Sequence, residues 1–208
     1  MSVRKKLNIG FLSIGSILLL ALIFTSAQFF RIGESVNHAN NVQSKEIAVF
    51  NKIQIQLNAQ NAFARTYISD SSSQNKDLLL DSTLKLTEAI NAIPKDTSSE
   101  INNTIQTIRN HNETLSTYVD SIIKSMGEQN ISSALTLVNS DYNYTNQGIA
   151  NLSQKLIDYK NGQLVNDIAT AERSINVSLI FSIIMVFLTI ILVVSFLLYI
   201  KRGITSPL

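Results

Sequence analysis

Few side chains in this sequence have the types and spacing that chemistry requires. The two histidines, His38 and His111, fall in separate segments, and neither has a carboxylate at metal-ligand spacing. The stretch RNHNE (residues 109–113) is densely polar, but neighbouring residues of a helix point in different directions, so it is typical of a solvated helix face. HExxH, CxxC, GxSxG and glycine-rich phosphate loops are absent from the sequence. We therefore expect no enzymatic activity, no metal and no cofactor.

The remaining candidates are binding residues. Arg65 lies in NAFARTYISD (residues 61–70), where its guanidinium could hold a carboxylate through two hydrogen bonds, with Tyr67 as an aromatic wall. Tyr142 and Tyr144 open the last long helical segment, and we expect them at the same outer end of the molecule. The alternative is an exposed arginine on a helix surface and tyrosines that cap an apolar core. Composition leaves both interpretations open.

Two apolar stretches set the organisation of the chain. Residues 8–30 and 175–200 contain no charged residue, and each is longer than the roughly 20 residues that cross a bilayer. The terminal segments, residues 1–7 and 201–208, carry five basic and no acidic residues, whereas residues 31–174 carry a net charge of −3 (12 basic, 15 acidic). This asymmetry predicts a two-pass cell-membrane protein with both termini in the cytoplasm and residues 31–174 outside. The pI of about 8.8 then reflects topology and gives no reason to expect nucleic acid.

A cleaved signal peptide is the rival interpretation of the first apolar stretch. Thr25-Ser26-Ala27 has the small residues of a cleavage site. The uncharged run of residues 8–30 is, however, longer than the roughly 7–15 residues of a signal core, which favours a retained anchor. The sequence contains no cysteine, so no disulfide stabilises the region between the two stretches.

Residues 31–174 show helical periodicity almost throughout. We expect one helix from the first apolar stretch to about Ile68, a second that Pro94 ends, and a third over residues 101–126. A fourth is expected to start near Asp141 or Tyr142 and to run into the second apolar stretch. A short helix is expected over residues 131–139, after GEQN (residues 127–130), and Thr97 and Glu100 have capping-box spacing. The clearest apolar seam belongs to the third helix: Ile101, Ile105, Ile108, Asn112, Leu115, Val119, Ile122 and Met126. The fold class predicted is all-α, an antiparallel four-helix bundle anchored in a membrane.

The last residues, KRGITSPL (201–208), resemble the start of a HAMP domain, with Ile204, Pro207 and Leu208 at the spacing that opens its first helix. Residues 126–159 (MGEQNISSALTLVNSDYNYTNQGIANLSQKLIDY) resemble the sensor domain of methyl-accepting chemotaxis proteins, in pattern more than in identity. The resemblance implies a homodimer packed through the first and fourth helices, with Ile53, Leu57, Leu164 and Ile168 as interface candidates.

The same resemblance implies that a small ligand, or a ligand-loaded binding protein, engages the outer end of the bundle. A small shift of the fourth helix would then pass through HAMP to a cytoplasmic kinase-control module. The family's amino-acid-binding members use arginines on these helices, and Arg65 alone lies in a comparable place. Two alternatives stay open: the same input module of a histidine kinase or cyclase, and a structural helical rod in the membrane.

Overall fold

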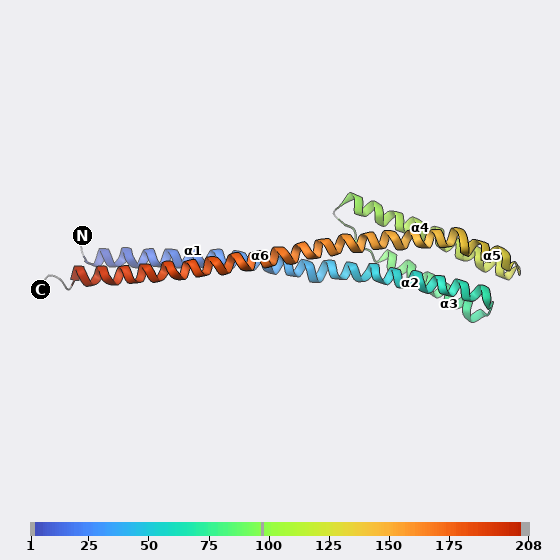
Figure 1. Cartoon of the computed structure of the whole chain (residues 1–208), viewed down its shortest axis with the longest axis horizontal. Helices are drawn as coiled ribbons and strands as arrows, with labels where there is room; N and C mark the ends of the chain where they lie inside the picture. Colours follow the sequence, from blue (N-terminus) through green and yellow to red (C-terminus); the bar gives the residue numbers. More distant parts are fainter. Residues whose placement is uncertain (1–2, 97, 205–208) are drawn as a thin grey trace. The chain divides into compact units, whose positions relative to one another are not determined.

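The computed structural model describes residues 3–96 and 98–204, and this part of the chain is helical without any strand (Figure 1). The predicted all-α class is confirmed. The elements are α1 (Val3–His38), the π-helix η1 (Ala39–Gln43), α2 (Ser44–Ser69), α3 (Ser73–Asn91), α4 (Ser99–Gly127), α5 (Ile131–Leu137), the π-helix η2 (Val138–Tyr142) and α6 (Asn143–Ile204). They form two compact units: the apolar unit (Met1–Ala39 and Val165–Leu208) and the helical unit (Asn40–Leu164).

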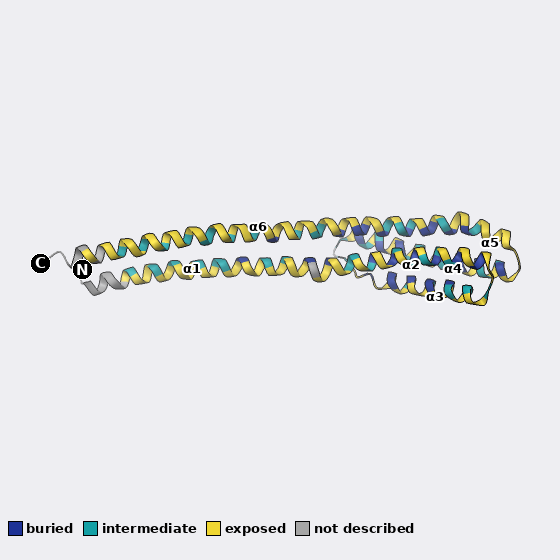
Figure 2. Cartoon of the chain, turned by 60° about the horizontal axis from the view of Figure 1, so that its bottom comes forward, coloured by how far each residue is buried: buried dark blue, intermediate teal, exposed yellow. Residues whose placement is uncertain are grey.

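The apolar unit holds the two stretches without charge. Two helices of the chain are long and apolar enough to cross a membrane, and their most apolar stretches have no buried residue. Figure 2 shows most of α1, and most of the part of α6 that belongs to the apolar unit, as exposed. The hydroxyls of Thr25 and Thr189 donate to the carbonyls of Ala21 and Met185, at 2.9 and 2.8 Å. These two hydroxyl groups are therefore satisfied within their own helices.

Aromatic rings pack α1 against α6 within the apolar unit. The rings of Phe24 and Phe181 have centroids 4.0 Å apart, and those of Phe11 and Phe196 meet edge to face at 5.7 Å. The Phe196 ring also lies directly on Gly10, where an added Cβ would be 2.2 Å from the ring carbon Cε2. Only glycine allows this close approach of the ring to the α1 backbone.

Side-chain caps define the helix ends of the helical unit. Ser72 accepts a hydrogen bond from the Asn75 backbone N–H at the start of α3, and Ser98 accepts one from Ile101 at the start of α4. Ser98 is thus the cap of α4, and Thr97, which the sequence offered for this role, lies outside the described residues.

The connection after α4 turns at Gln129, whose φ is 60°. In this left-handed conformation the Asn130 N–H reaches back to the Ser125 carbonyl at 2.8 Å, which closes the end of α4. The Asn130 side chain then accepts from the Ser133 N–H and caps the short helix α5. The predicted break at residues 127–130 is confirmed, but the residue that adopts the unusual backbone is Gln129 and not Gly127.

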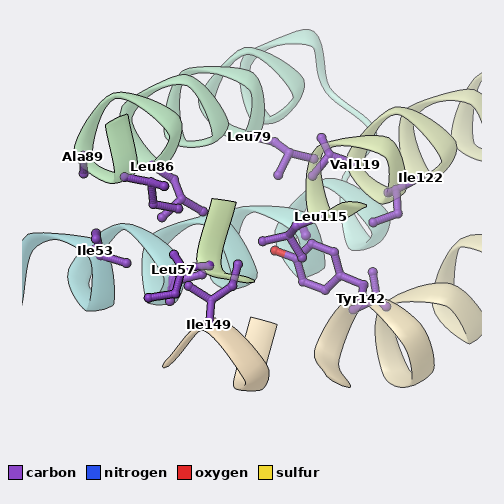
Figure 3. Packing of buried hydrophobic residues seen from close by; sticks show 14 of the residues in the cluster. Ile53, Leu57, Leu79, Leu86, Ala89, Leu115, Val119, Ile122, Tyr142 and Ile149 are labelled. Carbon is purple, nitrogen blue, oxygen red and sulfur yellow. The ribbon is translucent and has the colours of Figure 1, made fainter. Parts of the chain in front are cut away.

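One apolar core is formed by residues of α2, α3, α4, α5, η2 and α6 (Figure 3). The eight residues predicted as the seam of the third helix are the eight buried residues of α4. Ile53 and Leu57 of α2, Leu79 and Leu86 of α3 and Ile149 of α6 face them. Polar residues interrupt this core, since Gln60 donates to Thr83 Oγ1 at 2.8 Å and Asn112 donates to Thr87 Oγ1 at 3.0 Å.

The seam of α6 follows the sequence pattern only in part. Ile149, Leu156 and Ile157 are buried, as their spacing predicts. Leu164 is half-buried and Ile168 is 48% exposed, so these two predicted interface residues are not fully covered by a single chain. The sequence also predicts one continuous first helix, but in the structure the π-helix η1 separates α1 from α2.

Candidate functional site

Arg65, the predicted carboxylate-binding residue, lies exposed on α2 and joins it to η2. Its Nε donates to Asn61 Oδ1 at 3.3 Å and its Nη1 donates to Asn139 Oδ1 at 3.2 Å. These bonds use two of the five N–H groups of the guanidinium, and the other three remain to bind an anion. The geometry therefore serves both interpretations of Arg65, as a link between elements and as an anion-binding group.

The tyrosines predicted beside Arg65 separate into core and surface residues. Tyr67 and Tyr142 are buried, and the Tyr142 hydroxyl donates to Gln60 Oε1 at 3.4 Å. Burial raises the pKa of Tyr142 well above its usual range, although the Arg65 charge and a hydrogen bond with Asn146 act in the opposite direction. Tyr144 is 79% exposed. Tyr67 and Tyr142 thus have the placement of core tyrosines, and only Tyr144 presents its ring to a ligand in solution.

An open polar groove of about 510 Å³ lies between the end of α4, α5 and η2. Its lining is mostly hydroxyl-bearing, and Asp141 lies at its edge. Ser121 donates its hydroxyl hydrogen to the Thr117 carbonyl of α4 at 2.9 Å, and Ser140 of η2 donates to the Thr136 carbonyl of α5 at 2.8 Å. Among the described residues that line the groove, none is a lysine, arginine or histidine, and Arg65 lies outside this lining.

The most concentrated charge of the helical unit lies around Lys160. Its Nζ is 2.7 Å from Glu46 Oε2 and 2.5 Å from Asp96 Oδ2, and the side chains of Lys160, Glu46 and Asp96 are only 7%, 13% and 10% exposed. Burial lowers the pKa of Lys160, but hydrogen bonds and charges from Asp96 and Glu46 outweigh this and leave that pKa above its ordinary value. We call these three residues the charged triad. They come from α2, the α3–α4 connection and α6.

Sequence reasoning missed the charged triad although a signal was present. Glu46 falls on the inward-facing line of the first helix, between Gln43 and Phe50. Lys160 follows Leu156 and Ile157 by four and three residues, which is the next inward position of the α6 seam. Charged residues of opposite sign at inward positions of two neighbouring helices indicate a buried ion pair.

The interface candidates also divide by exposure. Ile53 and Leu57 are 0% and 1% exposed in the core of a single chain, so they are not at the surface where a second copy could contact them. The exposed apolar residue of this part of α2 is Ile55, at 63%. On α6, Ile168 is accessible and Leu164 is half-buried.

The HAMP-like residues lie at the limit of the described chain. Ile204 is the last residue of α6, whereas Pro207 and Leu208 lie outside the described residues. Among the described residues, no group of three or more histidine and carboxylate side chains could hold a metal ion. His38 instead pairs with Asp167, with 2.7 Å between Nδ1 and Oδ2.

No protein-family model matches the sequence, and no curated protein or solved structure matches the chain.

Proposed function

We propose that this chain is the extracellular sensing and transmembrane portion of a chemotaxis-type receptor, and that it is not an enzyme. In this proposal the helical unit is an antiparallel four-helix bundle outside the cell. Its first and last helices continue into two membrane-spanning segments, and both termini lie in the cytoplasm. A displacement of α6 would carry the signal to a HAMP domain and a kinase-control module.

The observation that carries the proposal is the continuity of α6. This helix runs from Asn143 to Ile204 without interruption, so residues of the apolar core and residues of the second apolar stretch belong to one helix. A helix transmits displacement only where its hydrogen-bonded backbone is unbroken, and α6 contains no proline. The exposed apolar surfaces of α1 and α6 support lipid as their surroundings.

The proposal is tested by fusing the chain at Leu208 to the HAMP and kinase-control region of a characterised chemoreceptor. In cells without other receptors, we expect the fusion to control kinase activity. One alanine inserted after Leu164 rotates the rest of α6 by about 100° and should change kinase output, whereas four inserted residues restore the phase approximately and should restore output. Kinase output that is the same in all three fusions would contradict signalling through α6 and favour the structural rod.

The proposed homodimer uses exposed residues of α2 and α6. Cysteine at Ile55 should crosslink between subunits in membranes, and cysteine at Ile168 should do so as well, because both side chains are accessible. Cysteine at Ile53 is the matched control, since its side chain is fully buried in the same helix. Crosslinking from Ile53 that equals crosslinking from Ile55 would refute this dimer face.

Ligand binding is assigned to Arg65 and the exposed Tyr144. Arg65→Ala should abolish the response of the fusion to carboxylate attractants, with little change in the unfolding of the helical unit, because both Arg65 hydrogen bonds are exposed. Arg65→Lys is the control, since it keeps the charge and loses the planar fork of donors. A large loss of stability in Arg65→Ala would mark Arg65 as structural.

A further inference from the structure

The charged triad places three ionised side chains in a buried position, where apolar residues are usual. Its two carboxylates and one ammonium leave a net charge of −1 among side chains that are at most 13% exposed. Apolar residues of similar size often stabilise a buried position as well as an ion pair does, because ions lose their hydration on burial. Stability alone therefore does not account for the triad, and its geometry is the property to explain.

Asp96 is held in a fixed orientation by its own loop. Its backbone N–H donates to Asn102 Oδ1 at 3.0 Å, and its carbonyl accepts from Asn102 Nδ2 at 2.7 Å. Its Oδ1 accepts from the Ser98 N–H at 2.8 Å. This leaves Oδ2 directed at Lys160 Nζ. The carboxylate is thus preorganised before Lys160 reaches it, and it cannot follow a moving lysine without breaking the start of α4.

Lys160 is also the last buried residue of α6 in the helical unit. The residues that follow, 161–164, are exposed or half-buried. Five residues earlier, Lys155 Nζ lies 3.5 Å from Glu100 Oε1, but that pair is 63% and 77% exposed and so contributes little. The triad is therefore the final point at which the helical unit holds α6.

We propose that the charged triad is a latch that fixes the axial position of α6 against α2 and the α3–α4 connection. Both short contacts of Lys160 can form together only within a narrow range of positions of α6. Signalling displacements of a helix are about 1–2 Å, which lengthens a 2.5 Å contact to about 3.5 Å or more where the shift lies along the contact and the lysine side chain keeps its rotamer. Release of the latch ends the contact of Lys160 with the α3–α4 connection, whose own hydrogen bonds through Asn102 and Ser98 remain. The role of the latch in signalling rests on the proposed function, whereas the axial position of α6 can be measured without a kinase assay.

Disulfide trapping in the full-length chain reports this position. Gln54 Nε2 donates to Gln154 Oε1 at 3.0 Å, and Gln154 Nε2 donates to Asp158 Oδ1 at 2.9 Å, so 154 and 158 are successive positions on the face of α6 towards Gln54. The chain has no cysteine of its own. Two double variants are prepared in lipid nanodiscs, and both carry Gln54→Cys. The first adds Gln154→Cys and the second adds Asp158→Cys, so the ratio of their crosslinking rates reports the register of α6.

The latch is opened by Lys160→Met, Glu46→Gln and Asp96→Asn together, which remove the charges and keep an acceptor for Ser98. We expect the ratio of 54–154 to 54–158 crosslinking to fall by about threefold or more. A change of this size corresponds to the interaction energies that are measured between residues in contact. Lys155→Met is the matched control and should leave the ratio unchanged. A folded triple variant with an unchanged ratio would overturn the latch.

If the triple variant loses its helicity, Glu46→Gln alone decides the question. It leaves Lys160 paired with Asp96 as a neutral pair, so the core remains satisfied. A latch requires the ratio to fall in this variant too, and an unchanged ratio contradicts it. These results are independent of the fusion assay, so failure of the latch and failure of the proposed receptor function are distinguishable.

Discussion

Lys160→Met should destabilise the helical unit far more than a surface substitution. Each Lys160 contact, at 2.5 and 2.7 Å, corresponds to about 6 kcal/mol of Coulomb attraction at an effective dielectric constant of about 20. Desolvation of the ions offsets several kcal/mol per ion, and the substitution leaves both carboxylates buried without a cation. Loss of one partner from such a group costs about 3–5 kcal/mol.

The assay is urea unfolding of the full chain in nanodiscs, followed by far-UV circular dichroism, at pH 7. Lys155→Met is the control, because its ion pair with Glu100 is exposed and should contribute about 0–1 kcal/mol. Adding Asp96→Asn to Lys160→Met removes one of the two unpaired carboxylates and should recover part of the loss.

The pH dependence provides a further check with a defined sign. The pKa of Lys160 is raised in the folded state, so its stabilising contribution is complete below the ordinary value of 10.5 and is lost as pH rises through the raised pKa. In Lys160→Met this loss of stability at high pH should be absent. A pH-independent loss below about 1 kcal/mol would refute the assignment of a buried, charged triad.

Three further predictions concern other positions. Gly10→Leu should increase the distance between α1 and α6 in spin-label measurements, because Phe196 occupies the space that a Cβ needs. Gly15→Leu is the control and should leave this distance unchanged, since no described atom lies within 4 Å of its Cβ position. Gln129→Gly should stabilise the helical unit to urea by about 0.5–1 kcal/mol, because glycine adopts the positive φ without strain; a loss would show that the Gln129 side chain contributes. Asn112→Leu should leave stability unchanged or raise it by about 1 kcal/mol, since Asn112 Oδ1 has no hydrogen-bond partner among the described residues and Thr87 keeps its bond to the Thr83 carbonyl. A large loss in urea unfolding would contradict this.

The helices of the helical unit follow closely from sequence periodicity. The seam of α4 was predicted at all eight positions, because a long amphipathic helix between two turn segments can bury only one face. The break before α3 and the end of α4 are likewise local, since Ser72 and Asn130 cap the helices that follow them. Local pattern and local caps were sufficient for these elements.

The residues at the candidate sites were less predictable, because their environment depends on contacts between distant segments. Ile53 and Leu57 have the spacing of an apolar line, but spacing does not tell whether that line faces the chain's own core or a second copy. Tyr67 has the same ambiguity and lies in the core. Lys160 was missed because a charged residue is normally assigned to the surface, and its partner Asp96 is 64 positions away in sequence.

The position of the charged triad bears on how a helix can signal. Apolar contacts such as those of Ile149 and Leu156 are not directional, so they hold α6 in the core and tolerate a small slide along its axis. The contacts of Lys160 depend on distance and orientation, so a slide of the same size lengthens and weakens them. Apolar contacts therefore keep α6 packed in the core of the helical unit along most of its buried length. The charges at its last buried residue in this unit define its axial position. Under the proposed function, a ligand needs to supply only the difference in free energy between the latched and released positions, and substitutions in the triad should shift that balance without altering the ligand site at Arg65.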